Sequence, residues 1–144
     1  MNPKPVEILL VEDNEDDILI ITEALGEAKL LNLINVMRDG EQALAYLRGE
    51  GAFRDAKMPG LILLDINMPK KNGFEVLEEI KADPGLRHIP IIMMTVSERD
   101  EDILRSYSEG ACSYIKKPLD FRKLQEVIRG FELYWTLVSS IPHR

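Results

Sequence analysis

The sequence predicts a doubly wound α/β domain, in which helices cover both faces of a five-stranded parallel sheet. Two observations predict this fold. Short, mostly apolar segments recur along the chain, which is typical of strands buried on both faces. Longer segments with apolar residues three and four positions apart lie between them, which indicates amphipathic helices. A strict alternation of strand and helix favours right-handed crossovers and hence a parallel sheet.

Five segments have the length and composition of strands. They are Val6 to Val11, Asn32 to Met37, Leu61 to Leu64, Ile91 to Met94 and Ser113 to Ile115.

The intervening segments are expected to form helices that each cover the sheet. Their apolar faces are Ile18, Ile21, Leu25 and Ala28; Ala43, Leu44 and Leu47; Leu77 and Ile80, after Gly73; and Ile103, Leu104 and Tyr107. The last helix begins near Asp120, a suitable N-cap, and its apolar positions are Phe121, Leu124, Ile128, Phe131 and Trp135.

Length and composition indicate one domain. With 144 residues, 45% of them hydrophobic, the chain fills one core and is too short for two ordinary domains. We expect a single domain over residues 1–144 with its core at about 6–131, and after Phe131 only the end of a helix and a short tail, without an output domain. The connection from Arg48 to Pro59 is long, and we interpret it as a tolerated surface loop rather than a partner-facing insertion.

Charge and motif content exclude several classes. The net charge of -7 argues against nucleic-acid binding. No apolar segment approaches the length of about 20 residues that spans a bilayer, so we expect no membrane contact. The sequence lacks a signal-peptide pattern, and its lone cysteine, Cys112, cannot form an internal disulfide, so we expect a cytoplasmic protein.

Acidic residues end two of the predicted strands. Glu12 and Asp13 follow the first, and Asp65 follows the third. If these strands are parallel neighbours, three carboxyl groups share one edge of the sheet, where ligands bind in this fold class. Each like-charge pair at about 5 Å costs roughly 3 kcal/mol. A bound divalent cation, a raised carboxyl pKa, or both would explain such a cluster.

A hydroxyl and an ammonium group join the acids, because Thr95 ends the fourth strand and Lys117 follows the fifth. The order and spacing of these residues resemble the CheY-like receiver domain of two-component response regulators, from Val6 to about Phe131. The resemblance implies a flavodoxin-like fold with strand order 2-1-3-4-5. The long loop before Pro59, the Ile89-Pro90 pair and the Tyr134-Trp135 pair are similar to the single-domain regulators associated with bacterial phytochromes.

The resemblance implies a role for each residue. Asp65 accepts a phosphoryl group, and Mg²⁺ is held by Glu12, Asp13, Asp65 and the backbone carbonyl of Asn67. Lys117 adds positive charge opposite the metal, since phosphoryl transfer depends on alignment and electrostatic stabilisation.

The same resemblance implies a conformational switch. Thr95 hydrogen-bonds the phosphoryl group, Tyr114 turns inward, and partner affinity changes by a population shift. Asn67 and Ser97 tune hydrolysis, and both are small and polar, so we expect an intermediate phosphoryl lifetime. The peptide bond before Pro118 is expected to be cis.

The implied partners are a sensor histidine kinase, with the phytochrome type as one candidate, and a downstream protein target or phosphotransfer protein. The tail carries the apolar residues Phe131, Tyr134, Trp135 and Val138. They could pack onto the sheet of their own chain or contribute to a homodimer through the face formed by the fourth helix, fifth strand and fifth helix, and we give the two alternatives equal weight. We expect that the protein is not an enzyme and catalyses only its own phosphorylation and dephosphorylation.

Two other functions remain open. A small Mg²⁺-dependent phosphatase also uses a strand-end aspartate nucleophile, but it typically has a second aspartate where this sequence has Asn67. A phosphorylation-independent binding module would be expected to lack part of the acid, threonine and lysine set. Taken singly, each residue more often has a structural role, as a cap, a surface lysine or a packing aromatic. The combination is what favours the receiver.

Overall fold

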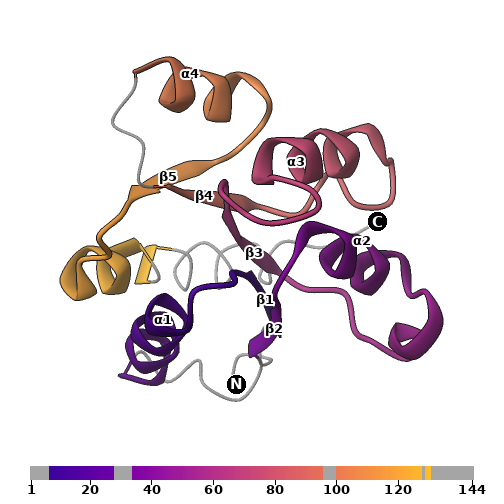
Figure 1. Ribbon diagram of the computed structural model, residues 1–144, viewed down its shortest axis with the longest axis horizontal. Helices are drawn as coiled ribbons and strands as arrows, with labels where there is room; N and C mark the ends of the chain where they lie inside the picture. The colour runs from indigo at the N-terminus through magenta and orange to yellow at the C-terminus, as the bar shows by residue number, and fades with distance from the viewer. Residues whose placement is uncertain (1–6, 28–33, 96–99, 128, 131–144) are drawn as a thin grey trace, which may run out of the picture.

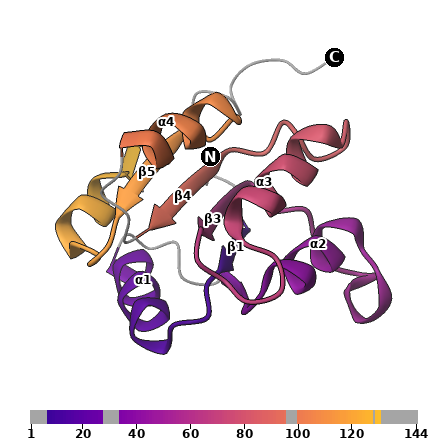
Figure 2. The ribbon, with the colours of Figure 1, turned by 45° about the horizontal axis from the view of Figure 1, so that its top comes forward.

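A five-stranded parallel sheet forms the centre of the molecule. The computed structural model describes residues 7–27, 34–95, 100–127 and 129–130. The strand order is β2-β1-β3-β4-β5, as predicted. The strands are β1 (Ile8–Val11), β2 (Ile34–Met37), β3 (Leu61–Asp65), β4 (Ile91–Thr95) and β5 (Ser113–Lys116). Because all neighbouring pairs are parallel, the carboxyl ends of the strands meet at one edge (Figure 2).

Three strands end one residue later than the apolar pattern predicts. Asp65, Thr95 and Lys116 belong to β3, β4 and β5, because the strand pairing continues through Asp65 with Met94 and through Thr95 with Lys116. The first strand begins at Ile8 rather than Val6, which lies outside the described residues. The sheet therefore holds the polar side chains at its edge on regular, paired backbone.

The helices lie in the segments where the periodicity predicts them. They are α1 (Glu15–Glu27), α2 (Gly40–Arg48), α3 (Gly73–Ala82) and α4 (Asp100–Ser108), and residues 121–127 are also helical. Asp120 caps this last helix as expected, because its Oδ1 accepts from the backbone N–H of Arg122 at 2.9 Å. None of the helices that the structure describes combines the length and the apolar character that crossing a bilayer requires.

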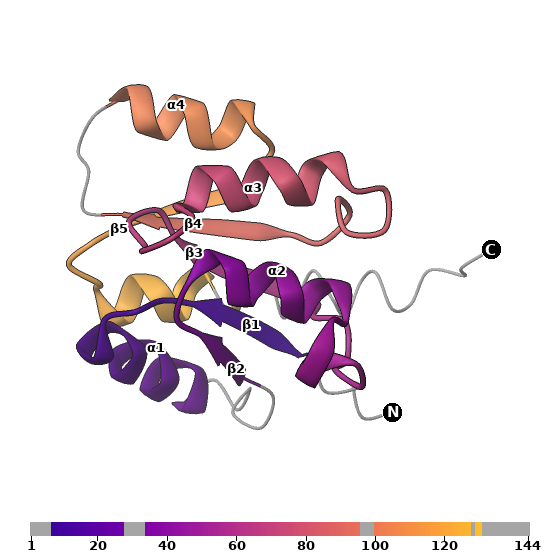
Figure 3. The same cartoon turned by 45° about the vertical axis from the view of Figure 1, so that its right-hand side comes forward.

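Alternate residues of the strands supply two separate cores (Figure 3). Leu9, Ile62 and Met93 are buried against α2 and α3 on one face. Leu10, Leu63 and Met94 are buried on the opposite face against α1 and Leu124 of the last helix. Fully burying each such side chain stabilises the fold by about 1.5–3 kcal/mol. The two cores hold the sheet, and with it the carboxyl edge, in one register.

The fourth helix departs from the prediction. Its expected core residues Leu104 and Tyr107 are 69% and 50% exposed, whereas Ser106 is fully buried. The Arg105 guanidinium lies 4.1 Å from the centre of the Phe74 ring, so α4 contacts α3 through a cation–π pair. The three-residue spacing of Leu104 and Tyr107 predicted an apolar face on α4, but it did not indicate which face of the helix is turned toward the core. Figure 1 shows α4 standing apart from the layer formed by α2 and α3.

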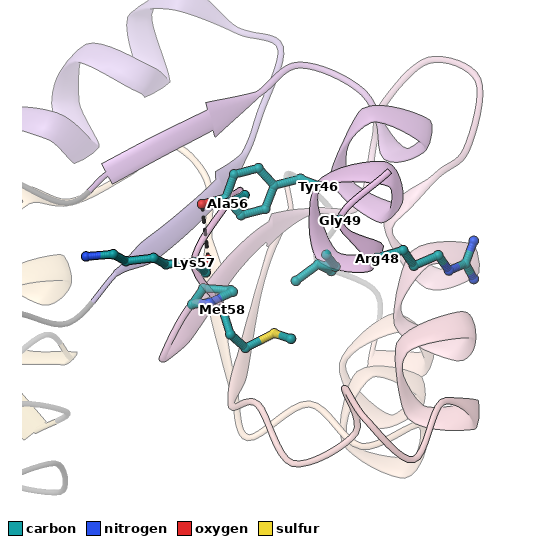
Figure 4. Close-up of a pocket in the computed structure, with 8 residues that line it drawn as sticks. Tyr46, Arg48, Gly49, Ala56, Lys57 and Met58 are labelled. Atoms are coloured by element: carbon teal, nitrogen blue, oxygen red, sulfur yellow. Dashed lines mark hydrogen bonds between the residues drawn. The ribbon is translucent and has the colours of Figure 1, made fainter. Parts of the chain in front are cut away.

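The long segment between α2 and β3 folds back onto α2 (Figure 4). It contains a short 3-10 helix, η2 (Gly51–Phe53), and the rings of Tyr46 and Phe53 pack edge to face with 5.5 Å between their centres. The Tyr46 hydroxyl donates to the Lys57 carbonyl at 3.4 Å. A cavity of about 220 Å³ remains between the segment and α2. It lies at the amino end of β3, away from the carboxyl edge.

Candidate functional site

Strand register places the acidic residues together. Val11 of β1 pairs with Leu64 of β3, so the next residues along, Glu12 and Asp65, lie side by side. One carboxylate oxygen from each of Glu12, Asp13 and Asp65 lies within 4.8 Å of the other two. Glu12 and Asp65 are buried, and Asp13 is exposed. The predicted neighbourhood of these carboxyl groups is confirmed.

Burial changes the ionisation of Glu12. Desolvation, the hydrogen bond with Asp65 and repulsion by its charge raise the pKa of Glu12 from 4.5 to about 8, although Lys117 opposes the shift. The Glu12 Oε2 accepts from the backbone N–H of Asp13 at 3.0 Å. At neutral pH the pocket thus favours a proton on Glu12, which reduces the repulsion among neighbouring carboxylates.

Lys117 reaches the same pocket from the residue after β5. Its side chain is 8% exposed, and its Nζ lies 3.5 Å from Asp65 Oδ2 and 2.8 Å from Asp17 Oδ2. Its Nζ also donates to Glu12. Burial by itself lowers the pKa of Lys117, but the hydrogen bonds to Asp17 and Glu12 and the charge of Asp65 more than offset this and raise it above its usual value. Lys117 therefore carries a permanent positive charge in the pocket.

The backbone around Asp65 is tightly packed. Its Oδ1 accepts from the Asn67 N–H at 3.2 Å. Gly73, the first residue of α3, packs directly behind it, and a Cβ at position 73 would lie 2.5 Å from the Asp65 carbonyl oxygen. Glycine is required at this position because two backbone segments approach closely.

Thr95 and Tyr114 lie beside one another on adjacent strands. Thr95 is fully buried, and the two side chains hydrogen-bond. Burial raises the pKa of Tyr114, and the charge of Asp102 adds to the shift, while the contact with Thr95 opposes it. The structure therefore brings together the residues that the sequence assigned to a switch.

The donor set suits a divalent cation. Three carboxyl groups provide hard oxygen ligands, and two of them lie in a pocket where a second positive charge would remove their repulsion. The raised pKa of Glu12 is what such a pocket produces when protons take the place of a cation.

The sequence matches the family described as the response regulator receiver domain over residues 8–129. The chain belongs to this family. Members of this family act in two-component signalling, and phosphorylation of an aspartate is general among them.

Individual relatives of this receiver domain are similar over most of their lengths. The response regulator Rcp1 of Synechocystis sp. is 37% identical over 141 residues, which cover 98% of this chain and 95% of Rcp1. The probable methanogenesis regulatory protein FilR2 of Methanothrix harundinacea is 41% identical over 132 residues, which cover 91% of this chain and 84% of FilR2.

Solved structures show the same fold. The phosphorylated cyanobacterial phytochrome response regulator RcpA superposes with a TM-score of 0.81 at 42% identity, covering 96% of this chain and 99% of RcpA. The Mn²⁺-bound form of Rcp1 superposes with a TM-score of 0.80 at 36% identity, covering 96% of this chain and all of that chain (100%).

Sequence reasoning missed one residue of the receiver site. Asp17 was not among the predicted site residues, yet its side chain pairs with Lys117. A signal was present, since Asp17 lies four residues after Asp13 in the same acidic segment. The Lys117-Pro118 bond is cis, as expected. Ser97 lies outside the described residues, and the metal-binding role of the Asn67 carbonyl stays a prediction.

Proposed function

We propose that Asp65 is the phosphoryl acceptor of this receiver domain. One observation carries the proposal. The buried Asp65 carboxylate lies among the carboxyl groups of Glu12 and Asp13 and 3.5 Å from the Lys117 ammonium, which also contacts Glu12. That arrangement offers a nucleophilic oxygen next to positive charge, in a pocket from which most water is excluded.

The proposed reaction transfers a phosphoryl group from the histidine of a kinase. A bond forms between an Asp65 oxygen and phosphorus as the phosphorus–nitrogen bond breaks, and the histidine nitrogen takes up a proton. Lys117 neutralises the charge on the phosphoryl oxygens, and the Asn67 N–H orients the acceptor through its 3.2 Å hydrogen bond to Oδ1. Water later hydrolyses the acyl phosphate and restores the carboxylate.

We propose Mg²⁺ as the cation, held by Asp13, Asp65 and the Asn67 carbonyl, with Glu12 acting through a bound water. When bound, Mg²⁺ supplies charge neutralisation for the transferring group. Support comes from the grouping of the three carboxyl groups and from the raised pKa of Glu12. The Mn²⁺-bound form of Rcp1 is a further parallel.

Signal output is proposed to pass through Thr95 and Tyr114. A phosphoryl oxygen would compete for the Thr95 hydroxyl that now bonds Tyr114, and the balance between two packings near β5 would shift. The small polar residues Asn67 and Ser97 are proposed to give an intermediate lifetime. A half-life of days for the adduct would contradict this.

The proposed kinase is of the phytochrome type, because RcpA is named a cyanobacterial phytochrome response regulator. We propose that the protein acts in the cytoplasm together with this kinase. The proposed output is altered affinity for a protein target or a phosphotransfer protein. We propose a domain core at about residues 6–131. The protein is proposed to turn over no metabolite. Homodimerisation stays a prediction, and the tail residues invoked for it lie outside the described residues.

Incubation with acetyl phosphate and Mg²⁺, followed by intact mass spectrometry, tests the acceptor. Wild type should gain roughly 80 Da, the mass of one phosphoryl group. The Asp65→Asn variant should gain nothing, and the exposed-site control Asp55→Asn should behave as wild type. Labelling of Asp65→Asn to the wild-type level would refute the assignment.

The same experiment separates the two alternatives. Rapid multiple turnover of the phosphodonor would favour a phosphatase, and no adduct on wild type would favour a binding module. The structure favours neither, since Asn67 stands where the phosphatases have their second aspartate and the described site retains its acids, threonine and lysine.

A further inference from the structure

Asp17, in the first turn of α1, turns its side chain into the receiver site. Its Oδ2 lies 2.8 Å from Lys117 Nζ, closer than Asp65 Oδ2 at 3.5 Å. The side chains of Asp17 and Lys117 are 17% and 8% exposed, so this pair is largely shielded from water. In Figures 1 and 2, α1 lies beside the helical segment 121–127 that follows β5, which explains how its first turn reaches Lys117.

Stabilisation of the helix amino terminus does not account for this geometry. Glu15 and Asp16 belong to the same turn, and both are exposed, with 73% of the Glu15 side chain in water. An acidic side chain complements the helix dipole from the surface without being buried. Burying a carboxylate is costly unless it is paired, so the pairing with Lys117 is what holds Asp17 in this position.

The lysine ammonium has three N–H donors. Glu12 accepts one and Asp17 accepts a second. With two donors taken by Glu12 and Asp17, the third is available to the Asp65 carboxylate, whose Oδ2 lies 3.5 Å from Nζ. A long, flexible lysine side chain would otherwise lose several rotamers each time it approached the phosphoryl group.

We propose that Asp17 is a positioning residue that holds Lys117 in the orientation required for phosphoryl transfer to Asp65. This inference rests on the proposed function of Asp65 and extends it to a fourth carboxylate. Asp17 itself does not touch the acceptor. Because Asp17 already orders Lys117 in the folded protein, the entropy lost on ordering this side chain belongs to folding and does not add to the barrier of phosphoryl transfer.

The kinetic experiment compares three variants by rapid-quench mass spectrometry with acetyl phosphate at saturating Mg²⁺. Asp17→Asn should slow phosphorylation of Asp65 about tenfold, the change expected for loss of one charged hydrogen bond. Asp16→Asn removes the same charge from the same turn at an exposed site and should stay within about twofold of wild type. Asp17→Glu, which keeps the carboxylate, should recover most of the lost rate.

A double-mutant cycle on the free energy of unfolding tests the contact itself. Asp17→Asn, Lys117→Met and the double variant should show coupling between the two positions, because each single change removes the ion pair between the two side chains. Methionine keeps the length of the lysine stem, so the folded variants remain comparable.

Each other outcome overturns the proposal. An unchanged or faster rate for Asp17→Asn would show that Asp17 is irrelevant to Lys117 or restrains it, and additive unfolding energies would show that the contact is absent in solution. If Asp16→Asn slowed phosphorylation equally, the effect would come from negative charge in the first turn of α1 and not from the contact with Lys117. Failure of wild type to form any adduct would instead refute the proposed function, which keeps the two failures distinct.

Discussion

Replacing Gly73 by alanine tests whether the close packing behind Asp65 is required. A Cβ at this position would lie 2.5 Å from the Asp65 carbonyl oxygen, 2.7 Å from Ile66 Cα and 3.0 Å from the Asp65 carbonyl carbon. Ordinary contacts between such atoms are about 3.5–4.0 Å. All three are backbone atoms, which cannot rotate away as a side chain can, so either α3 or the end of β3 must move by about 1 Å.

The magnitude follows from two opposing effects. Overpacking costs about 1–3 kcal/mol, and the absence of any flexible neighbour places this site at the upper end. Alanine regains about 0.5–1 kcal/mol through its lower conformational entropy in the unfolded chain. We therefore expect a net loss of about 2 kcal/mol of unfolding free energy, or about 5 °C in the unfolding midpoint for a chain of this size.

Thermal and urea unfolding measure the stability, and phosphorylation of Asp65 at a temperature where the variant is folded measures the site. We expect the phosphorylation rate to fall at least about tenfold, because a displacement near 1 Å at the acceptor disturbs alignment. Gly85→Ala is the matched control, since its Cβ would meet only the Asp83 side chain at 3.4 Å. Wild-type stability and rate for Gly73→Ala would refute the reasoning.

Two further predictions concern ionisation and the switch. Without divalent cations, between pH 4.5 and about 8 the folded state keeps a proton on Glu12 that the unfolded state has already released, so the free energy of unfolding should fall by more than about 1 kcal/mol as pH rises from 5 to 8. Mg²⁺ should abolish this decline, and so should Glu12→Gln; unfolding midpoints measured in EDTA that stay level with pH would contradict the shift. Tyr114→Phe should remove the hydrogen bond with Thr95 and lower the free energy of unfolding by about 0.5–1.5 kcal/mol, as measured by unfolding. The phosphorylation rate, measured by intact mass, should stay within about twofold of wild type. A rate loss above about tenfold would place Tyr114 in the transfer step.

The elements that the sequence predicted well share strong local signals. In β1, β3 and β4 every residue is buried, and all are apolar except the strand-ending Asp65 and Thr95. The Asp120 cap and the apolar positions Ile21, Leu25 and Leu124 were also readable, because capping and period-3.6 burial depend on neighbouring residues.

The errors concern facts that neighbouring residues do not carry. The face of α4 was assigned to Leu104 and Tyr107, but Arg105 above Phe74 and the buried Ser106 decide its orientation. The need for glycine at position 73 is likewise not a local property, since the crowding comes from the β3 backbone folded behind it. The residues around Asp17 do not identify its partner either, because Lys117 lies 100 residues later in the chain.

The sequence by itself determined the fold class, the strand order through family resemblance, and the carboxyl, hydroxyl and ammonium groups of the site. These follow from hydrophobic period and from residues that end strands, both of which are local properties. Only the tertiary structure decided which carboxylates share a lysine, how far the pKa of Glu12 rises and where a glycine is obligatory. Such properties depend on distances of a few ångströms between segments remote in sequence, and folding alone sets those distances.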